Sequence, residues 1–509
     1  MSAPATTAIT TGPAIPLQAA DPCVHCGFCL PTCASYRVLG TEMDSPRGRI
    51  HTLRALEAGE LELDATVASH FDSCLGCFAC VSACPSGVRY DQLIEATRPR
   101  LNVPELRTPA QRALRRLLFA LLPYPRRLRA VLAPLRAYAG TPLQRLARSS
   151  GLTRLFGPEL EAMERLLPPL APQAFRDAMP ALVPAQGPRR LRVGLVLGCV
   201  QRLFDPAVNQ AAVRVLSANG IEVVIPPGQN CCGAVTHHQG ELAQTRELAQ
   251  QLIASFDAVI GPGRAAGPEP LDAVLVAASG CGHTLKQYPE LLGAAPLPDA
   301  ATSDPNGRPD SGVSGRAGLN GSGESGGLRD AVEASGSLAS AAPATASLPF
   351  AAPVYDIQEF LARVGLSDSF RASLRPLALP DGQLANAERP LQLVYHDACH
   401  MLHGQGLSRE PRQLLAQIPH VQLREAVEAG VCCGSAGIYN LVQPEVAAEL
   451  GRLKAEDLAS SGAAIAVSAN IGCSLQIRRH LNEAGHTLPV EHPMQLLARS
   501  AGLGGSAAT

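Results

Sequence analysis

Two short runs of cysteine have the spacing of iron–sulfur ligands. Residues 23–33 read CVHCGFCLPTC and residues 74–84 read CLGCFACVSAC, so both fit C-x2-C-x2-C-x3-C. In two-cluster ferredoxins with this spacing, three thiolates in series bind one cubane and the fourth cysteine ligates the other cluster. We therefore expect two [4Fe–4S] clusters that exchange one ligand each. The ligands expected for the first cluster are Cys23, Cys26, Cys29 and Cys84, and those for the second are Cys74, Cys77, Cys80 and Cys33.

Zinc and disulfide bridges are the alternatives for these cysteines. Zinc sites usually pair two C-x2-C units across a longer gap, so two runs of four cysteines favour iron–sulfur clusters. Pro85 follows the second run as in ferredoxins, whereas Ala34 follows Cys33 in the first run. This departure should move a turn without removing a thiolate.

The segment between the two runs should be helical. Ser45 followed by Pro46 is typical of a helix start, and Ile50, Leu53 and Leu56 then recur with a near-helical period. We therefore predict an all-helical ferredoxin module over residues 14–100.

Three polar residues of this module could influence a cluster. Arg47 and Arg49 could place positive charge nearby and raise its potential, although solvated or helix-capping arginines explain them equally well. His25 could donate a hydrogen bond to a cluster sulfur, but it could also simply fill the loop.

The other eight cysteines form two sets with one plan: a cysteine after an apolar segment, a Cys-Cys-Gly triplet, and a later cysteine after another apolar segment. The first gap is 32 residues in one set and 33 in the other. The sets are Cys199, Cys231, Cys232 and Cys281, and Cys399, Cys432, Cys433 and Cys473.

The apolar segments that precede these thiols predict buried strands. LRVGLVLGC and LDAVLVAASGC lead to thiols in the first repeat, and LQLVYHDAC and AAIAVSANIGC do so in the second. Each strand is expected to end at its thiol. Helical segments fill the intervals, so each repeat should form a parallel α/β sheet. Ligands bind such sheets at the carboxyl ends of the strands, where these thiols would gather.

The role of these eight thiols is open at this point. Each set could hold a further iron–sulfur centre, act as a redox-active pair, or shape the interface between the repeats. His396 and His400 flank Cys399 and could take part in proton-coupled steps.

Composition indicates the partners and the cellular compartment in which this chemistry takes place. The 509 residues include 16 cysteines and carry a formal net charge of −1, which gives no reason to expect nucleic acid as a partner. Neither a signal peptide nor an apolar run of roughly 18 residues is visible. We therefore expect a cytoplasmic protein, where thiols stay reduced and serve metal or redox chemistry.

The predicted organisation is α+β and multidomain: a helical ferredoxin module is followed by two repeated α/β cysteine-rich domains. A Gly-, Ser- and Ala-rich stretch should be a disordered linker, and its GSGESG sequence a chance match to a dinucleotide motif. We find no convincing dinucleotide fingerprint, so any flavin should bind another subunit. The predicted ranges are 14–100 for the ferredoxin module, 101–188 for a helical connector, 189–295 for the first repeat, 296–352 for the linker and 353–502 for the second repeat.

The connector is unusually basic. Residues 105–170 are rich in Arg and Leu and have a helical pattern. Such a stretch could lie on an anionic membrane surface or dock a partner, and it could equally pack on its own protein.

The string HCGFCLPTCASYRVLGTEMDSPRGRI at residues 25–50 resembles the iron–sulfur subunit of bacterial glycolate oxidase, also called glycolate dehydrogenase. The resemblance extends through CLGCFACVSACPSGVRYDQLIE and both cysteine-rich repeats. It implies an electron-transfer subunit without its own substrate site. A flavin subunit carrying FAD would oxidise glycolate to glyoxylate, and this chain would pass the electrons toward a quinone-type acceptor. The chain would then lie in the cytoplasm or peripherally on the inner face of the cell membrane.

The Cys-Cys-Gly repeats are shared more widely, with heterodisulfide reductases, lactate-utilisation proteins and a subunit of anaerobic glycerol-3-phosphate dehydrogenase. The alternatives are therefore the equivalent subunit of a lactate or glycerol-3-phosphate dehydrogenase, or a thiol–disulfide reductase subunit. In heterodisulfide reductases each repeat ends in C-x-x-C, but here Thr284 and Gln476 stand at the last position. This departure argues against a cluster of the heterodisulfide reductase type.

Overall fold

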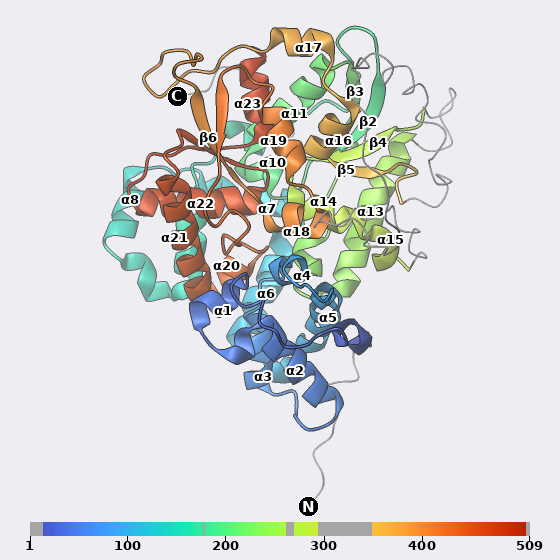
Figure 1. Cartoon of the computed structure of the whole chain (residues 1–509), viewed down its shortest axis with the longest axis vertical. Coiled ribbons are helices and arrows are strands. Elements are labelled where there is room, and N and C mark those ends of the chain that lie inside the picture. The colour runs from blue at the N-terminus through green and yellow to red at the C-terminus, as the bar shows by residue number, and fades with distance from the viewer. Residues whose placement is uncertain (1–13, 177–178, 261–268, 294–348, 505–509) are drawn as a thin grey trace, which may run out of the picture.

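Helices form the first third of the chain, and two α/β units follow them (Figure 1). The computed structural model describes residues 14–176, 179–260, 269–293 and 349–504. Most of the predicted linker lies outside the described residues. None of the described helices has both the length and the apolar character needed to cross a membrane.

The ferredoxin module is all-helical over its described residues, as the sequence predicts. Ser45 Oγ accepts a hydrogen bond from the backbone N–H of Gly48 at 3.0 Å, and Pro46 opens the helix that follows. Ile50 and Leu53 on this helix are buried in the core of the module. The α-helices are α1 (Ala34–Leu39), α2 (Pro46–Glu57), α3 (Ala65–Asp72), α4 (Ala79–Ser82) and α5 (Tyr90–Thr97).

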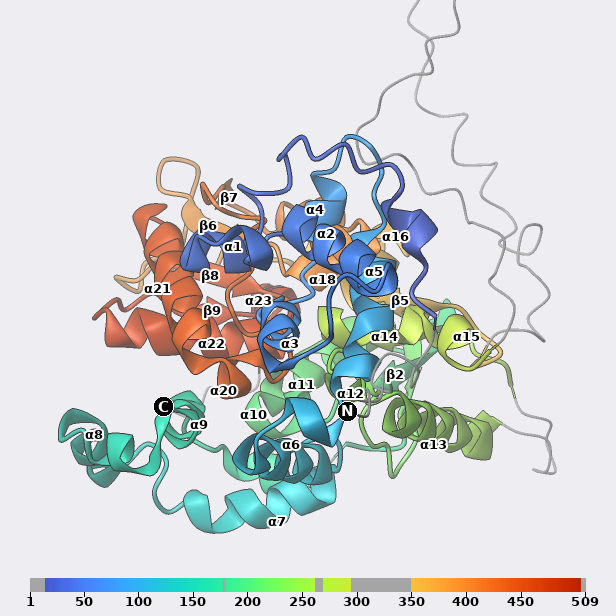
Figure 2. The ribbon, with the colours of Figure 1, turned by 90° about the horizontal axis from the view of Figure 1, so that it is seen from below.

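The connector consists of helices that each begin with proline, whose fixed φ suits the first turn. Thr108 and Thr141 cap two of them with their side-chain oxygens. These helices are α6 (Pro109–Leu121), α7 (Pro125–Leu135), α8 (Pro142–Ser149) and α9 (Pro158–Leu166). In Figure 2, α6, α7 and α8 form a layer at the lower edge, on the side away from α1, α2 and α4.

The first α/β unit has a five-stranded sheet in the order β1-β3-β2-β4-β5. Its strands are parallel except for β1, which pairs antiparallel with β3. The strands are β1 (Leu182–Val183), β2 (Leu191–Val196), β3 (Ile221–Val224), β4 (Ala273–Val276) and β5 (Val354–Asp356). The helices are α10 (Gln201–Phe204), α11 (Pro206–Ala218), α12 (Ala234–His237), α13 (Leu242–Ile260), α14 (Ser279–Lys286), α15 (Tyr288–Leu291) and α16 (Ile357–Val364).

The second unit has four parallel strands in the order β7-β6-β8-β9, which matches β3-β2-β4-β5. Its strands are β6 (Leu391–His396), β7 (Val421–Arg424), β8 (Ile465–Ser468) and β9 (Val490–Glu491). The helices are α17 (Asp368–Ser373), α18 (Cys399–Gln405), α19 (Arg409–Leu415), α20 (Tyr439–Val442), α21 (Pro444–Ser460), α22 (Ile471–Glu483) and α23 (Pro493–Ser500).

The first repeat extends beyond the linker. Strand β5 lies in the range predicted for the second repeat, but Val354 pairs with Val274 of β4. The reason is that each repeat ends in a strand, a capping residue and a helix. Asp356 caps α16 after β5, and His492 caps α23 after β9. The similar sequences VYDIQEFLA and VEHPMQLLA carry this shared ending.

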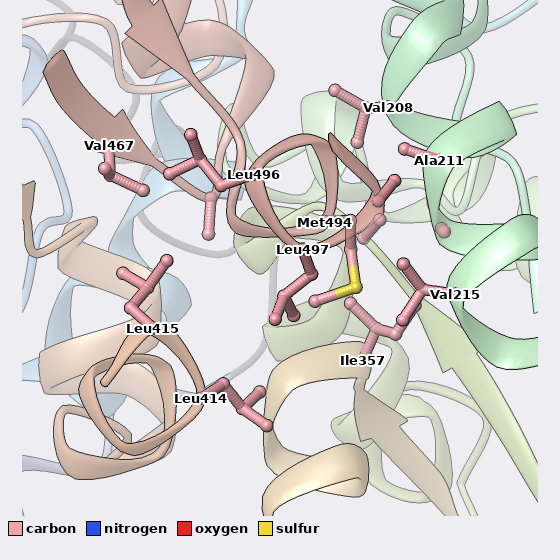
Figure 3. Packing of buried hydrophobic residues seen from close by; sticks show 14 of the residues in the cluster. Val208, Ala211, Val215, Ile357, Leu414, Leu415, Val467, Met494, Leu496 and Leu497 are labelled. Atoms are coloured by element: carbon pink, nitrogen blue, oxygen red, sulfur yellow. The ribbon is translucent and has the colours of Figure 1, made fainter. Parts of the chain in front are cut away.

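The two repeats exchange these final helices. Helix α23 packs on α11 of the first repeat, and α16 packs on α19 of the second. Met494 and Leu497 of α23 lie beside Val215 of α11, with Ile357 of α16 nearby (Figure 3). One apolar core therefore joins both sheets and fixes the repeats to each other.

The cap of α23 predicts an acid-sensitive contact. His492 Nδ1 accepts from the N–H of Met494, and Nε2 lies 3.0 Å from the carbonyl oxygen of Ala277 in the first repeat. Burial lowers the pKa of His492 to about 3. The neutral ring therefore stabilises the fold above the unfolded pKa of about 6.5, and this stability is lost as the pH falls toward 3.

We expect His492→Asn, which keeps a capping side chain, to lack this pH dependence. Going from pH 7 to pH 5 should cost the natural chain about 2 kcal/mol more than the variant. Denaturant unfolding followed by circular dichroism at both pH values measures the difference. Equal losses in the two proteins would contradict the assignment. His420→Asn, at an exposed histidine, is the matched control.

Candidate metal centres

The first ferredoxin set lines one cavity at the surface of the module. Cys23, Cys26, Cys29 and Cys84 all border it. Cys26 is exposed, and beside it Val24 and Phe28 are 71 % and 65 % exposed. A centre held here would lie close to the surface, within reach of a partner protein.

The loop of this set is shaped by its backbone and by one arginine. Gly27 has a φ of 87°, where a side chain would be strained. Arg47 donates from Nη1 to the carbonyl oxygen of His25 at 3.1 Å and also pairs with Glu42. The contact with His25 holds the loop against α2. Burial raises the pKa of Cys29 to about 11, so a thiolate here calls for a nearby cation.

The second ferredoxin set lines a more deeply buried cavity. Cys33, Cys74, Cys77 and Cys80 border it. Burial holds the pKa of Cys77 and of Cys80 above the usual range. Thiolates bind iron, so these neutral thiols suit a site where a bound metal supplies the missing positive charge.

The structure thus brings together the two sets that the exchanged spacing predicts. Cys84 joins the cysteines of the first run, and Cys33 joins those of the second. Cys80 borders both cavities, so the two expected clusters would be neighbours. Eight free thiols in this arrangement fit two cubanes, and the ligation itself stays a prediction.

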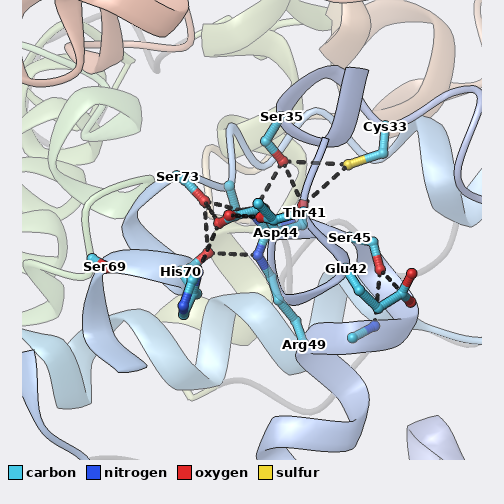
Figure 4. A network of polar contacts seen from close by, with 12 residues as sticks. Cys33, Ser35, Thr41, Glu42, Asp44, Ser45, Arg49, Ser69, His70 and Ser73 are labelled. Carbon is cyan, nitrogen blue, oxygen red and sulfur yellow. Dashed lines mark hydrogen bonds and ion pairs between the residues drawn. The ribbon is translucent and has the colours of Figure 1, made fainter. Parts of the chain in front are cut away.

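A buried polar network supports the second cavity (Figure 4). Arg49 is 1 % exposed and borders the cavity beside Cys33 and Cys74. It donates to the carbonyl oxygen of His70 at 2.6 Å and to the hydroxyl oxygen of Ser73 at 2.7 Å. Of the two arginines singled out in the sequence, Arg49 is therefore the buried one.

Asp44 is the buried anion of this network. Burial opposes its ionised form, but hydrogen bonds, of which that from Ser73 is the strongest, outweigh this and lower its pKa. Its carboxylate lies 3.7 Å from the guanidinium of Arg49. The two charges therefore compensate each other in a site that water hardly reaches.

The first repeat gathers its four thiols at the carboxyl ends of its strands. Cys199, Cys231 and Cys232 are buried, and Cys281 is half-buried beside them. Hydrogen bonds from the thiols of Cys199 and Cys232 lower the pKa of Cys231. The backbone N–H of Gly233 also lies 3.3 Å from its sulfur, so one thiolate is stabilised in this set.

The second repeat gathers a matching set and adds a histidine. His396, Cys433 and Cys473 place one ligand atom each within 4.8 Å of one another, and all three are buried. Hydrogen bonds from the thiols of Cys432 and Cys473 lower the pKa of Cys433. The imidazole of His396 also lowers the pKa of Cys433. A buried imidazole beside thiols is typical of a metal ligand.

His396 is a residue whose place in this candidate metal site the sequence did not reveal. It ends β6 three residues before Cys399, and Val196 holds the same place before Cys199. A comparison of the two repeats at this position is the signal that could have found it.

The thiols that follow the apolar segments lie just beyond the ends of their strands. Each was expected to end a strand, but Cys399 opens α18, Cys281 lies in α14 and Cys473 in α22. Parallel strands here turn directly into helices, so the thiols occupy the first helical turns. They still meet at the same edge of the sheet.

The second ferredoxin cavity adjoins the thiols of the second repeat. Leu75 and Cys77 belong to one apolar cluster with Cys399 and Cys432. The thiol of Cys399 is also among the charges that raise the pKa of Cys77, after burial itself. Two hydrogen bonds fix this junction. They run from Tyr439 Oη to the carbonyl oxygen of Ser73 at 2.9 Å, and between His400 Nε2 and the carbonyl oxygen of Gly76 at 2.9 Å.

Buried histidines fill the space where both repeats meet the ferredoxin module. The ring of His238 lies 4.3 Å from that of His400, which lies 5.1 Å from that of His283. Burial lowers the pKa of all three, so the cluster is neutral. Nε2 of His238 and of His283 has no hydrogen-bond partner among the described residues.

A helical module with two cysteine-lined cavities, followed by paired cysteine-rich α/β units, defines an iron–sulfur electron-transfer protein. Residues 19–88 match the 4Fe-4S dicluster domain family, and residues 193–286 and 393–478 match the cysteine-rich domain family. Residues 110–167 match the linker region of the glycolate oxidase iron–sulfur subunit.

Curated relatives cover nearly the whole chain. The probable glycolate oxidase iron–sulfur subunit of Bacillus subtilis is 32 % identical over 94 % of both chains. The glycolate oxidase iron–sulfur subunit of Escherichia coli is 30 % identical over 94 % of this chain and 93 % of the relative. Lactate utilization protein A of an Exiguobacterium species is 24 % identical over 60 % of this chain and 96 % of its own length. This chain belongs to the family of glycolate oxidase iron–sulfur subunits and is a subunit of an oxidoreductase complex.

Proposed function

We propose that this subunit carries electrons from a flavin subunit, which holds FAD and oxidises glycolate to glyoxylate, toward a quinone-type acceptor. The observation that supports this path most directly is the shared packing of Cys77 with Cys399 and Cys432. The exposed set near Cys26 would receive electrons, and the buried set near Cys77 would pass them to the second repeat. We also propose that the chain lies in the cytoplasm, where the flavin subunit would bind it.

The proposed cofactors are two [4Fe–4S] clusters and a further centre in the second repeat. The first two would be held by the ferredoxin cysteines in the exchanged pattern. The further centre would be held by Cys399, Cys432, Cys433 and Cys473 together with His396. Iron–sulfur clusters accept one electron at a time, which suits a carrier that divides the two electrons of a flavin.

The experiment is to purify the complex without oxygen and to assay iron, acid-labile sulfide and glycolate-dependent dye reduction. About 8 iron and 8 sulfide per chain are expected for the ferredoxin module alone. Zinc without sulfide would contradict the proposal. Comparing glycolate with lactate and glycerol 3-phosphate as substrates tests the choice of donor.

We predict that His396→Val removes a nitrogen ligand from the further centre. Valine stands at the matching position 196 of the first repeat, so the local fold should accept it. Pulsed electron paramagnetic resonance of the reduced protein should show nitrogen coupling that the variant lacks, while about 8 iron of the ferredoxin module remain. His420→Asn should keep the coupling. No coupling in the natural chain would overturn the assignment.

A further inference from the structure

Helix α8 has its apolar side turned outward. Gln144 is only 3 % exposed and donates to the carboxylate of Glu164 at 3.0 Å. Arg148 pairs with the same carboxylate at 3.1 Å, so polar contacts fix the inner side of the helix. Leu143 and Leu146 are 61 % and 62 % exposed. This is the reverse of an ordinary surface helix, whose apolar side faces the core.

Exposed apolar side chains are concentrated in this part of the molecule. Eight of the sixteen large exposed apolar residues in the described part of the chain lie within residues 117–160. Leu152 and Leu155, in the segment that follows α8, are 53 % and 80 % exposed, and Val131 and Leu135 of α7 are exposed as well. Scattered exposed leucines are normal, but a concentration of this kind marks an interaction surface.

The same region carries an excess of positive charge. Residues 106–158 contain eleven arginines and no aspartate, glutamate or lysine, whereas the whole chain has a net charge of −1. Arg116, Arg126 and Arg145 are exposed, and no acidic side chain of the described residues pairs with them. A polyanionic surface would therefore be attracted to this region.

We infer that the exposed apolar and basic side chains of the connector, the leucine–arginine face, bind the surface of an anionic lipid bilayer. This face comprises Val131, Leu135, Leu143, Leu146, Leu152 and Leu155 with Arg126 and Arg145. Leucines that enter the boundary of the acyl chains, with arginines at the level of anionic headgroups, are the usual pattern of a peripheral membrane helix. A protein partner would need an acidic patch to match this excess of positive charge.

The position of the face suits this role. Helices α7 and α8 lie at the edge of the molecule away from α1, α2 and α4 (Figure 2). The ferredoxin module would thus stay free for a partner while the connector lies on the bilayer. The inference extends the proposed quinone-type acceptor, which is lipid-soluble, but membrane binding needs neither substrate nor electron transfer.

The test is flotation of the full chain, with its cofactors, on vesicles of phosphatidylglycerol and phosphatidylcholine in equal parts, compared with phosphatidylcholine alone. We expect at least about tenfold stronger binding to the anionic vesicles, weakened at about 0.5 M KCl. The double variant Leu143→Ser/Leu146→Ser should lose about tenfold or more, and Arg126→Glu/Arg145→Glu a similar factor.

Matched controls are Leu384→Ser and Arg409→Glu, at exposed positions outside the connector, and both should bind as the natural chain does. Absence of binding to anionic vesicles would overturn the inference. So would binding that the leucine and arginine variants retain, or protection of α8 from hydrogen exchange by the flavin subunit alone. Dye reduction in solution is measured without vesicles, so the proposed electron-transfer role can fail or hold separately.

Discussion

Replacing Cys77 by serine should remove the second ferredoxin cluster and abolish glycolate-dependent electron transfer through the complex. Cys77 borders the buried cavity with Cys33, Cys74 and Cys80, and it packs against Cys399. A cubane in a buried site is held poorly once it loses one of its four thiolates. The nearest other thiol, that of Cys399, is itself a proposed ligand of the further centre. Iron should fall by about 4 per chain, and glycolate-dependent dye reduction by the complex should fall at least about a hundredfold.

Cys26→Ser is the matched comparison, because it removes a thiolate from the other cavity. Its expected loss is also about 4 iron, but the electron paramagnetic resonance signal that disappears should be a different one. The two variants together test the exchanged ligand pattern. If Cys77→Ser kept its iron and activity, or if both variants lost the same signal, the assignment of the two sets would be wrong.

The grouping of the ferredoxin cysteines could be predicted from sequence because its determinants are local. Three cysteines within seven residues can reach one cubane almost regardless of what surrounds them, so the spacing alone separates the sets. The fourth ligand of each set comes from the distant run, and it could be assigned only because the pattern occurs twice. The helix start at Ser45 is equally local, since cap and proline act within one turn.

Features that depend on packing could not be predicted in this way. Strand β5 pairs with β4 although a long stretch separates them in sequence, and the exchange of α16 and α23 between repeats is a tertiary choice. His396 gains its place beside Cys433 only when β6 and the Cys-Cys-Gly loop meet. For the basic connector, the sequence did not distinguish binding to a membrane, docking of a partner and packing on its own protein. The sequence of α8 does not show which side of the helix faces outward.

Arg49→Met should destabilise the ferredoxin module by about 3–5 kcal/mol, because it leaves a buried carboxylate without its counter-charge. Arg49 is 1 % exposed. Its guanidinium donates hydrogen bonds to the hydroxyl oxygens of Ser35 and Ser73 and pairs with the carboxylate of Asp44. Methionine fills a similar volume but supplies none of these hydrogen bonds, so the serine hydroxyls also lose partners. The midpoint of denaturant-induced bleaching of the visible absorption, measured without oxygen, reports the loss.

The same variant should also lower the reduction potential of the second cluster. Arg49 borders the cavity of Cys33 and Cys74, so its removal takes away positive charge that would stabilise an added electron. Arg49→Lys keeps the charge without the planar fork and should restore much of the potential but less of the stability. Arg54→Met, at a half-exposed arginine of the same helix, should change both quantities little. If Arg49→Met and Arg54→Met were equally stable and had equal potentials, Arg49 would be an ordinary helix residue, and the second cavity would owe its charge balance to the thiolates and iron alone.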